Sequence, residues 1–245
     1  MKEIIAVIGG AGGIGSAIVK RFSRKNNYLI VGDIDDKKGN SLISSLGELA
    51  SFIKIDVLKD DSIKVFSSEL MKNNKYPNHI VSLAGWALKD EFSGIANCYS
   101  DIVDKSINLN LQSHINIVRE LLPLLNQSNK KNKSITLISS INAVKSYGLP
   151  VYSSAKAGLI GFTKAIAGEL GSKGIRVNVV LPGTVKTEMT LGEPKDFKRL
   201  KEGSLLNRFA TTSEIAEVVY AVAKKMTCIT GQVIIADCGQ TVKGY

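Results

Sequence analysis

The sequence predicts an α/β fold, a doubly wound parallel sheet of about seven strands with helices on both faces. Short apolar stretches rich in β-branched residues alternate along the chain with stretches whose apolar residues recur at helical spacing. Strands that are buried on both faces and joined through helices have this pattern. A glycine-rich turn directly after the first apolar stretch is a second observation, since such turns occupy the ligand-binding edge of a doubly wound sheet.

Seven strands are expected, at residues 4–8, 28–31, 51–55, 79–83, 134–138, 176–181 and 232–236. Helices are expected from residue 14 onward and at 37–46, 60–73, 101–125 and 152–170. The 245 residues contain no linker and suit one domain spanning 1–245. Residues 188–207 are charged and only weakly periodic, so they are expected to form either a substrate lid or a solvated surface helix.

Composition narrows the functional classes. No apolar run approaches the ~20 residues of a membrane span, and residues 1–8 lack the features of a signal peptide, so a cytoplasmic protein without a membrane partner is expected. The formal net charge of +10 comes from scattered lysines without a nucleic-acid-binding motif. This favours a solvated surface, or steering of an anionic ligand, over nucleic acid binding.

Cys98, Cys228 and Cys238 have neither disulfide nor metal-ligand spacing, so free thiols and no metal are expected.

Residues 4–15 are predicted to form a strand, a glycine turn and the start of a helix. This order is typical of the first unit of a Rossmann-type sheet that binds a dinucleotide. The glycines satisfy the G-x-G-x-x-G template and also a wider one formed by Gly9, Gly13 and Gly15. We favour the wider template because it begins directly at the strand end. These three glycines and Ile14 are the predicted phosphate-binding residues, and the alternative is a glycine-rich turn that binds nothing.

Asp33 follows the second strand, 18 residues after Gly15. An acid about 20 residues beyond the glycine turn meets the ribose hydroxyls of NAD. The same carboxylate would repel the additional phosphate of NADP, so NAD is the predicted cofactor in preference to NADP. Lys37 and Lys38 lie near enough in the sequence to soften that preference.

Tyr152 and Lys156 are four residues apart and therefore share one face of a predicted helix. A cation beside a phenol favours the phenolate and lowers the tyrosine pKa, which suits acid–base chemistry. Tyr220 and Lys224 repeat the spacing, but only Tyr152 closely follows a polar strand end, at Ser140. We therefore predict that Tyr152 carries the chemistry.

These features resemble the short-chain dehydrogenase/reductase family over essentially the whole chain, including its 3-oxoacyl-carrier-protein reductases and its sugar or alcohol dehydrogenases. The positions that match are the glycine loop, Asp56-Val57, Ala84-Gly85, Asn110-Leu111, Ser139-Ser140, Tyr152 with Lys156, Pro182-Gly183 with Thr187, and Thr230-Gly231 followed by Asp237.

The resemblance implies a role for each matching side chain. Ser140 would orient the substrate carbonyl, and Tyr152 would be the general acid or base. Lys156 would lower the pKa of Tyr152 and hold the nicotinamide ribose, while Asn110 would anchor a water molecule of a proton relay. Implied cofactor contacts are Asp56 and Val57 along the adenine, Thr187 on the nicotinamide amide, and Ala84, Gly85, Pro182 and Gly183. His79 and His114 are expected to be structural.

The sequence departs from the family pattern in two segments. Ser82 and Leu83 stand where the family usually has two asparagines before Ala-Gly, which affects strand pairing and cofactor-loop hydrogen bonds unless Ser82 replaces one amide. Cys238 stands where the family usually has glycine. Neither change touches the predicted catalytic residues, so activity is expected.

The predicted function is therefore NAD-dependent interconversion of a secondary alcohol and a ketone by hydride transfer. A 3-oxoacyl-thioester reductase, acting on esters of acyl carrier protein or coenzyme A, is the alternative within the same chemistry. Asp33 argues against it, because the resemblance implies NADPH for those reductases. Outside this chemistry, the alternatives are a non-catalytic dinucleotide-binding protein and a nucleic-acid-binding protein.

Two of the predicted helices suggest self-assembly. The helix at 101–125 is apolar over a wide arc, as in a helix that is sandwiched in a core or paired with another subunit. The helix at 152–170 is rich in small residues, which permit close packing. Because both resemble the helices through which family members associate, a homotetramer or a dimer is expected.

Overall fold

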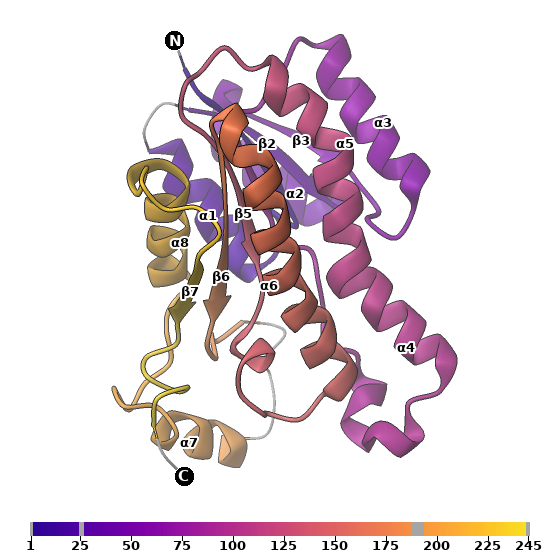
Figure 1. The fold of residues 1–245 in the computed structure, drawn as a ribbon, viewed down its shortest axis with the longest axis vertical. Helices are drawn as coiled ribbons and strands as arrows, with labels where there is room; N and C mark the ends of the chain where they lie inside the picture. Colours follow the sequence, from indigo (N-terminus) through magenta and orange to yellow (C-terminus); the bar gives the residue numbers. More distant parts are fainter. Residues whose placement is uncertain (1, 25–26, 188–193, 244–245) are drawn as a thin grey trace.

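A parallel sheet of seven strands forms the centre of the computed structural model, which describes residues 2–24, 27–187 and 194–243. The strand order is β3-β2-β1-β4-β5-β6-β7 (Figure 1). The strands are β1 (Ile4–Ile8), β2 (Tyr28–Asp33), β3 (Ala50–Lys54), β4 (His79–Ser82), β5 (Lys133–Ile138), β6 (Ile175–Pro182) and β7 (Val233–Ala236). The predicted fold class is confirmed, and all seven strands occur with ends shifted by at most two residues.

Helices cover both faces of the sheet. They are α1 (Gly13–Ser23), α2 (Asp36–Ser44), α3 (Asp60–Lys72), α4 (Ser100–Ile107), α5 (Ser113–Gln127), α6 (Pro150–Leu170), α7 (Pro194–Glu202) and α8 (Thr212–Tyr220). Figure 1 shows α1 and α8 on one side of the sheet and α3 and α5 on the other. Of the predicted lid at 188–207, residues 188–193 lie outside the described residues, and α7 occupies much of the remainder.

Two apolar cores, one on each face, hold these layers together. Phe66 of α3, Ile117 of α5 and Leu159 of α6 belong to one core and are fully buried. The other core joins α1, α2 and α8, where the rings of Phe22 and Tyr220 meet edge to face with centroids 5.1 Å apart. The central strands are buried on both faces, which explains their continuous β-branched sequences.

The order of the strands reverses at β1, which pairs with β2 on one side and β4 on the other. The carboxyl-terminal ends of all strands meet at one side of the sheet, here called the carboxyl edge. In doubly wound folds, ligands bind in the crevice at this edge beside the reversal point.

The predicted helix at 101–125 is interrupted, which corrects that prediction. Between α4 and α5 the chain forms a π-helical turn, η4 (Asn108–Gln112). Within it, the buried side chain of Asn110 bonds to backbone groups outside the helix instead of being accommodated on a regular α-helical face. Such turns are frequent at functional sites.

Strand pairing at Ser82 is intact without the asparagines that the family usually carries there. Ser82 pairs in register with Ile8 of β1 and Leu137 of β5. Its hydroxyl lies 2.7 Å from Nδ1 of His114, so the serine is also satisfied as a buried polar group. The substitution therefore leaves the sheet complete at this point.

Candidate active site

All the predicted site residues gather at or beside the carboxyl edge. Gly9 lies in the loop between β1 and α1, and the first turn of α1 contains Gly13, Ile14 and Gly15. The other predicted cofactor contacts lie at or after strand ends: Asp33 at the end of β2, Asp56 and Val57 after β3, Ala84 and Gly85 after β4, Pro182 at the end of β6, and Gly183 and Thr187 beyond it. Of the catalytic candidates, Ser140 follows β5, Asn110 lies on η4, and Tyr152 and Lys156 lie on α6.

The glycine loop is tightly packed against the segment that follows β4. Gly9 has a φ of +86°, and a Cβ atom there would lie 2.7 Å from the backbone nitrogen of Ala84, so only glycine fits. A Cβ atom at Gly13 would lie 2.9 Å from Cγ2 of Thr187, which brings the segment after β6 to the same loop. Helix α1 starts without a side-chain cap and without an acidic residue in its first turn. Its first N–H groups are therefore suited to a phosphate.

Asp33 lies next to this loop. Its Oδ2 accepts a hydrogen bond from the Ala11 backbone N–H at 2.9 Å, and its Oδ1 accepts one from Asp35 N–H at 3.1 Å. A carboxylate offers about four acceptor positions, so about two remain for other donors. Nζ of Lys38 lies 3.9 Å from a carboxylate oxygen of Asp35.

The catalytic candidates meet beside Gly85. A Cβ atom at Gly85 would lie 2.7 Å from Oδ1 of Asn110 and 2.9 Å from Nζ of Lys156, so both polar atoms approach the glycine that follows β4. Tyr152 and Lys156 are buried, and the lysine Nζ lies 5.7 Å from the centroid of the tyrosine ring. Nζ of Lys156 also donates to the Ile138 carbonyl at 3.4 Å.

The side chain of Asn110 fixes the backbone at Trp86, the residue after Gly85. The Trp86 N–H donates to Oδ1 of Asn110 at 3.0 Å, and Nδ2 of Asn110 donates to the Trp86 carbonyl at 2.9 Å. A third bond runs from Nδ2 to the Ser106 carbonyl at 3.1 Å. The π-helical turn and the strand end are therefore locked together.

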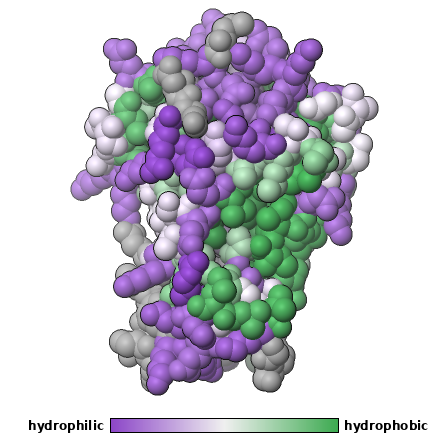
Figure 2. Space-filling view, turned by 90° about the vertical axis from the view of Figure 1, so that its left-hand side faces the viewer, coloured by the Kyte–Doolittle hydropathy of each residue, from purple (hydrophilic) through white to green (hydrophobic). Residues whose placement is uncertain are grey.

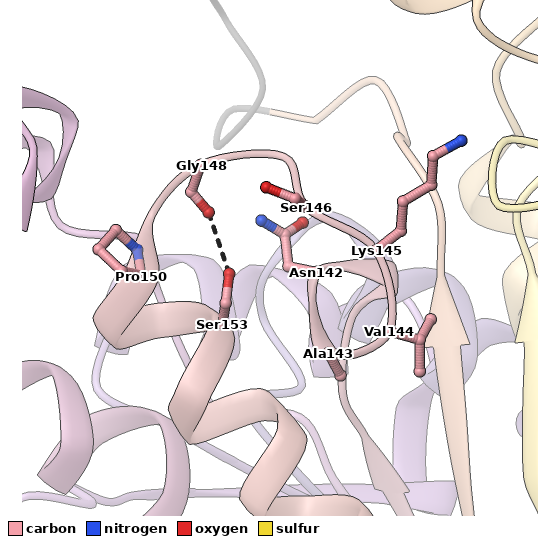
Figure 3. Close-up of a pocket in the computed structure, with 8 residues that line it drawn as sticks. All are labelled: Asn142, Ala143, Val144, Lys145, Ser146, Gly148, Pro150 and Ser153. Carbon is pink, nitrogen blue, oxygen red and sulfur yellow. Dashed lines mark hydrogen bonds between the residues drawn. The ribbon is translucent and has the colours of Figure 1, made fainter. Parts of the chain in front are cut away.

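Ser140 begins the connection from β5 to α6. Its Oγ accepts from the Asn142 N–H and donates to Oδ1 of Asn142, both at 3.2 Å. A cavity of about 380 Å³ is lined by the loop that follows and by the first turn of α6 (Figure 3). In Figure 3 the Lys145 side chain points away from the other lining side chains, and its Nζ donates to the carbonyls of Gln240 and Lys243.

Burial dominates the electrostatics of the catalytic candidates. It raises the pKa of Tyr152 to about 12; a hydrogen bond with Ser140 lowers this pKa, and the negative charge of Glu91 raises it further. Burial also lowers the pKa of Lys156 to about 7. The prediction that Lys156 brings the tyrosine pKa down is therefore wrong for the protein chain by itself, because desolvation wins and also drives the lysine toward its neutral form.

The second tyrosine–lysine pair has a structural place. Tyr220 is buried between α1 and α8, with the guanidinium carbon of Arg21 3.6 Å from its ring centroid. Lys224 forms an ion pair with Glu3, near the amino end of β1. This pair therefore lies near the amino end of β1 and away from the carboxyl edge.

Two polar residues that bear on the site do not appear among the predictions. Glu91 is buried and accepts a hydrogen bond from the backbone N–H of Tyr152 at 2.7 Å. Gln240 is also buried, and its Oε1 accepts from the Thr184 N–H, also at 2.7 Å. Both act across long sequence separations, so no local pattern reveals them.

Other features of the described residues bear on the remaining predictions. The three cysteines are free thiols. Across residues 2–24, 27–187 and 194–243 there is no group of three or more side chains that could hold a metal ion. No helix within those same ranges is both long and apolar enough to cross a membrane.

Comparison with known proteins agrees with this arrangement. A family model described as enoyl-(acyl carrier protein) reductase matches residues 9–241. The chain is 30% identical over 245 residues to a 3-oxoacyl-[acyl-carrier-protein] reductase of Buchnera aphidicola, covering 97% of each protein. It is 32% identical over 246 residues to the human protein of that name, covering 98% of each. The solved structure of a Burkholderia thailandensis oxidoreductase, described as a short-chain dehydrogenase/reductase, is similar with a TM-score of 0.89 at 28% identity, covering 100% of this chain and 94% of that one. This protein belongs to the short-chain dehydrogenase/reductase family.

Proposed function

We propose that the protein is an NAD-dependent oxidoreductase that interconverts a secondary alcohol and a ketone. The observation that carries the proposal is a chain of neighbours at the carboxyl edge: Asn110 and Lys156 approach Gly85, the Tyr152 ring lies next to Lys156, and Tyr152 forms a hydrogen bond with Ser140. The neighbouring glycine loop and Asp33 suit the phosphates and ribose of a dinucleotide.

When bound, the nicotinamide supplies hydride to a ketone carbon or accepts it from an alcohol carbon. The Ser140 hydroxyl donates a hydrogen bond to the substrate oxygen, where negative charge grows during reduction. The Tyr152 hydroxyl gives that oxygen a proton in reduction and takes one in oxidation. With a pKa of about 12, Tyr152 is protonated near neutral pH, which suits reduction. The polar atoms of Lys156 and Asn110 both approach Gly85, and they suit a relay that returns a proton to Tyr152.

The chain supplies a matched pair of variants for the first test. Tyr152→Phe removes the proton donor, so turnover measured by NADH absorbance should fall by about 10²–10⁴-fold while NAD binding is retained. Tyr220→Phe makes the same chemical change in the core and should leave turnover nearly unchanged. Equal losses in the two variants would show that the site has been assigned to the wrong tyrosine.

Cofactor choice rests on the carboxylate of Asp33. We expect NAD to be favoured at least tenfold in kcat/KM, since a charge-assisted hydrogen bond contributes roughly 1.5–3 kcal/mol and about 1.4 kcal/mol is tenfold. Asp33→Ala should reduce the ratio mainly by weakening NAD. In Asp33→Asn the side-chain oxygen can still accept the hydrogen bond from the Ala11 N–H, but the charge is gone. Comparison with Asp33→Ala therefore distinguishes the effect of the charge from an effect on the loop structure. If the ratio of kcat/KM for NAD to that for NADP were unchanged in both variants, the Asp33 carboxylate would not be the group that selects the cofactor.

A second candidate follows from the relatives, several of which are named 3-oxoacyl-[acyl-carrier-protein] reductases. It involves the same carbonyl chemistry on an acyl thioester. A panel of sugars, cyclic alcohols, steroids and 3-oxoacyl thioesters, each assayed with NADH and NADPH, separates the two. Selective turnover of the thioesters with NADPH would replace the first proposal by the second.

A further inference from the structure

Glu91 is a buried carboxylate in a segment that is otherwise exposed. It lies in the short helix η2 (Lys89–Ser93) and is only 1% exposed, whereas Phe92 beside it is 72% exposed. Its Oε2 accepts from the Tyr152 backbone N–H at 2.7 Å, and its Oε1 accepts from the Ser106 hydroxyl of α4 at 2.6 Å. Both carboxylate oxygens are therefore engaged, one of them by the proposed catalytic residue.

The N-terminus of helix α6 has no side-chain cap from the residue at its own N-cap position. Its N-cap residue, Leu149, has a left-handed backbone (φ 56°, ψ 65°) and makes no side-chain hydrogen bond to the helix. Pro150 comes next and has no N–H group. Tyr152 is the third residue of the helix, and the N–H at that position is one that an N-cap oxygen usually accepts. Glu91 accepts that hydrogen bond from 61 residues away.

We propose that Glu91 is a positioning residue for the proposed reaction, in which its carboxylate replaces the missing cap of α6 and holds Tyr152 in reach of Ser140. A carboxylate at a helix N-terminus is favoured by the free N–H groups and by the helix dipole. The bond to Ser106 ties the same carboxylate to α4. The inference rests on the proposed function, since it assigns Glu91 a part in setting the geometry of that chemistry.

The charge of Glu91 has a second effect that a purely structural cap would lack. Two charged groups lie near Tyr152, namely Lys156 on its own helix and Glu91 on η2, whereas Ser140 after β5 is neutral. His114 of α5 interacts with Lys156, and burial keeps this histidine uncharged. Glu91 is therefore the anion in this set, and its charge opposes formation of the phenolate. Removing the charge should shift the tyrosine titration to lower pH.

The experiment compares four full-length variants. In Glu91→Gln the amide oxygen can still accept from the Tyr152 N–H, but the charge is gone. In Glu91→Ala both the cap and the charge are lost. Ser106→Ala removes the second hydrogen bond to the carboxylate. Asp90→Asn makes the same charge change at the exposed neighbouring carboxylate and serves as the control.

We expect Glu91→Gln to move the pH profile of kcat for alcohol oxidation by about half a pH unit or more to lower pH, with kcat at its optimum within about fivefold of the wild type. Glu91→Ala should lower kcat by about 10–100-fold with the Kd for NAD within twofold, since small displacements of a catalytic group have large effects. The kcat of Ser106→Ala should lie between those of Glu91→Gln and Glu91→Ala. Asp90→Asn should have the kcat of the wild type.

Hydrogen exchange in residues 149–156 gives a readout that does not depend on turnover. Glu91→Ala should speed exchange of the Tyr152 amide, and Glu91→Gln should not. An unshifted pH profile in Glu91→Gln, or a kcat in Glu91→Ala that equals the wild type in folded protein, would overturn the proposal. If Tyr152→Phe is fully active, the proposed function fails, whereas the exchange result still decides whether Glu91 caps the helix.

Discussion

His79 shows at the scale of a single residue how burial makes a titratable group responsive to pH. The side chain is fully buried, and its Nδ1 lies 2.8 Å from the Ser134 hydroxyl. Burial lowers its pKa to about 3, helped by the positive charges of Lys224 and Arg176. As the pH falls below 6.5, the unfolded chain binds a proton at this position before the folded protein does. The contribution of neutral His79 to stability is complete above pH 6.5 and is lost toward pH 3.

This linkage predicts acid sensitivity of a defined size. Between pH 7 and pH 5, titration of His79 should remove about 2 kcal/mol from the free energy of unfolding. Urea unfolding at both pH values should therefore show a steeper pH dependence for the wild type than for His79→Gln. Parallel losses of stability in the two proteins would mean that His79 has an ordinary pKa in the folded state.

Residues also differ in how far the sequence reveals them. Tyr152 and Lys156 can be predicted because their relation is local, four positions on one helix, and Ser140 because it follows a strand end. Glu91 cannot, because its partner on α6 is 61 residues away and its own segment has no periodic pattern. The direction of the Tyr152 pKa shift also escapes the sequence, since it depends on how deeply the fold buries the ring.

The π-helical turn η4 is the clearest case at the scale of an element. Apolar residues continue at nearly helical spacing through 101–125, and this periodicity predicts one helix. A single π-helical turn shifts the helix face on which the following apolar residues lie, but it leaves their spacing nearly helical. The spacing of apolar residues therefore does not reveal the turn. What accompanies the turn is a set of hydrogen bonds between Asn110 and the backbone of Trp86 and Ser106, and the two with Trp86 depend on tertiary structure.

Two asparagines of that turn offer a direct test of this account. Asn110→Ala leaves the buried amide's partners at Trp86 and Ser106 unpaired, and should cost about 1–3 kcal/mol of unfolding free energy. Asn108→Ala changes an exposed asparagine in the same turn and should cost less than about 0.5 kcal/mol. Urea unfolding of both variants measures the difference, and equal costs would contradict a specific role for the Asn110 amide.

At the scale of the whole molecule, the expected association of copies of the chain would use exposed apolar and small side chains. Figure 2 faces the side that carries α8 and β7 and shows hydrophobic side chains concentrated in its middle and lower parts. Ile235 of β7 is 45% exposed. On α6, Gly161 and Gly168 are exposed, and a Cβ atom at either would meet nothing within 4 Å. The expected homotetramer or dimer stays a prediction.

Light scattering tests the assembly. A homotetramer should give a particle of about 106 kDa, four times the 26.4 kDa of one chain. If the small-residue surface of α6 is a subunit contact, Gly161→Glu should reduce the particle mass while the chain stays folded. Ser41→Glu, on the exposed side of α2, should leave the mass unchanged. A mass near 26 kDa for the wild type at micromolar concentration would refute the expectation.

The packing of α8 against α1 also has a consequence for biosynthesis. Arg21 and Glu217, which join the two helices, are 196 residues apart, and Phe22 meets Tyr220 at the same contact. At about 5–20 residues per second, a ribosome needs roughly 10–40 s to supply the second partner after the first. During that interval the outer apolar face of α1 has no cover, so the nascent chain is most vulnerable to aggregation before its last helices emerge. Refolding from denaturant should accordingly lose yield as the protein concentration rises.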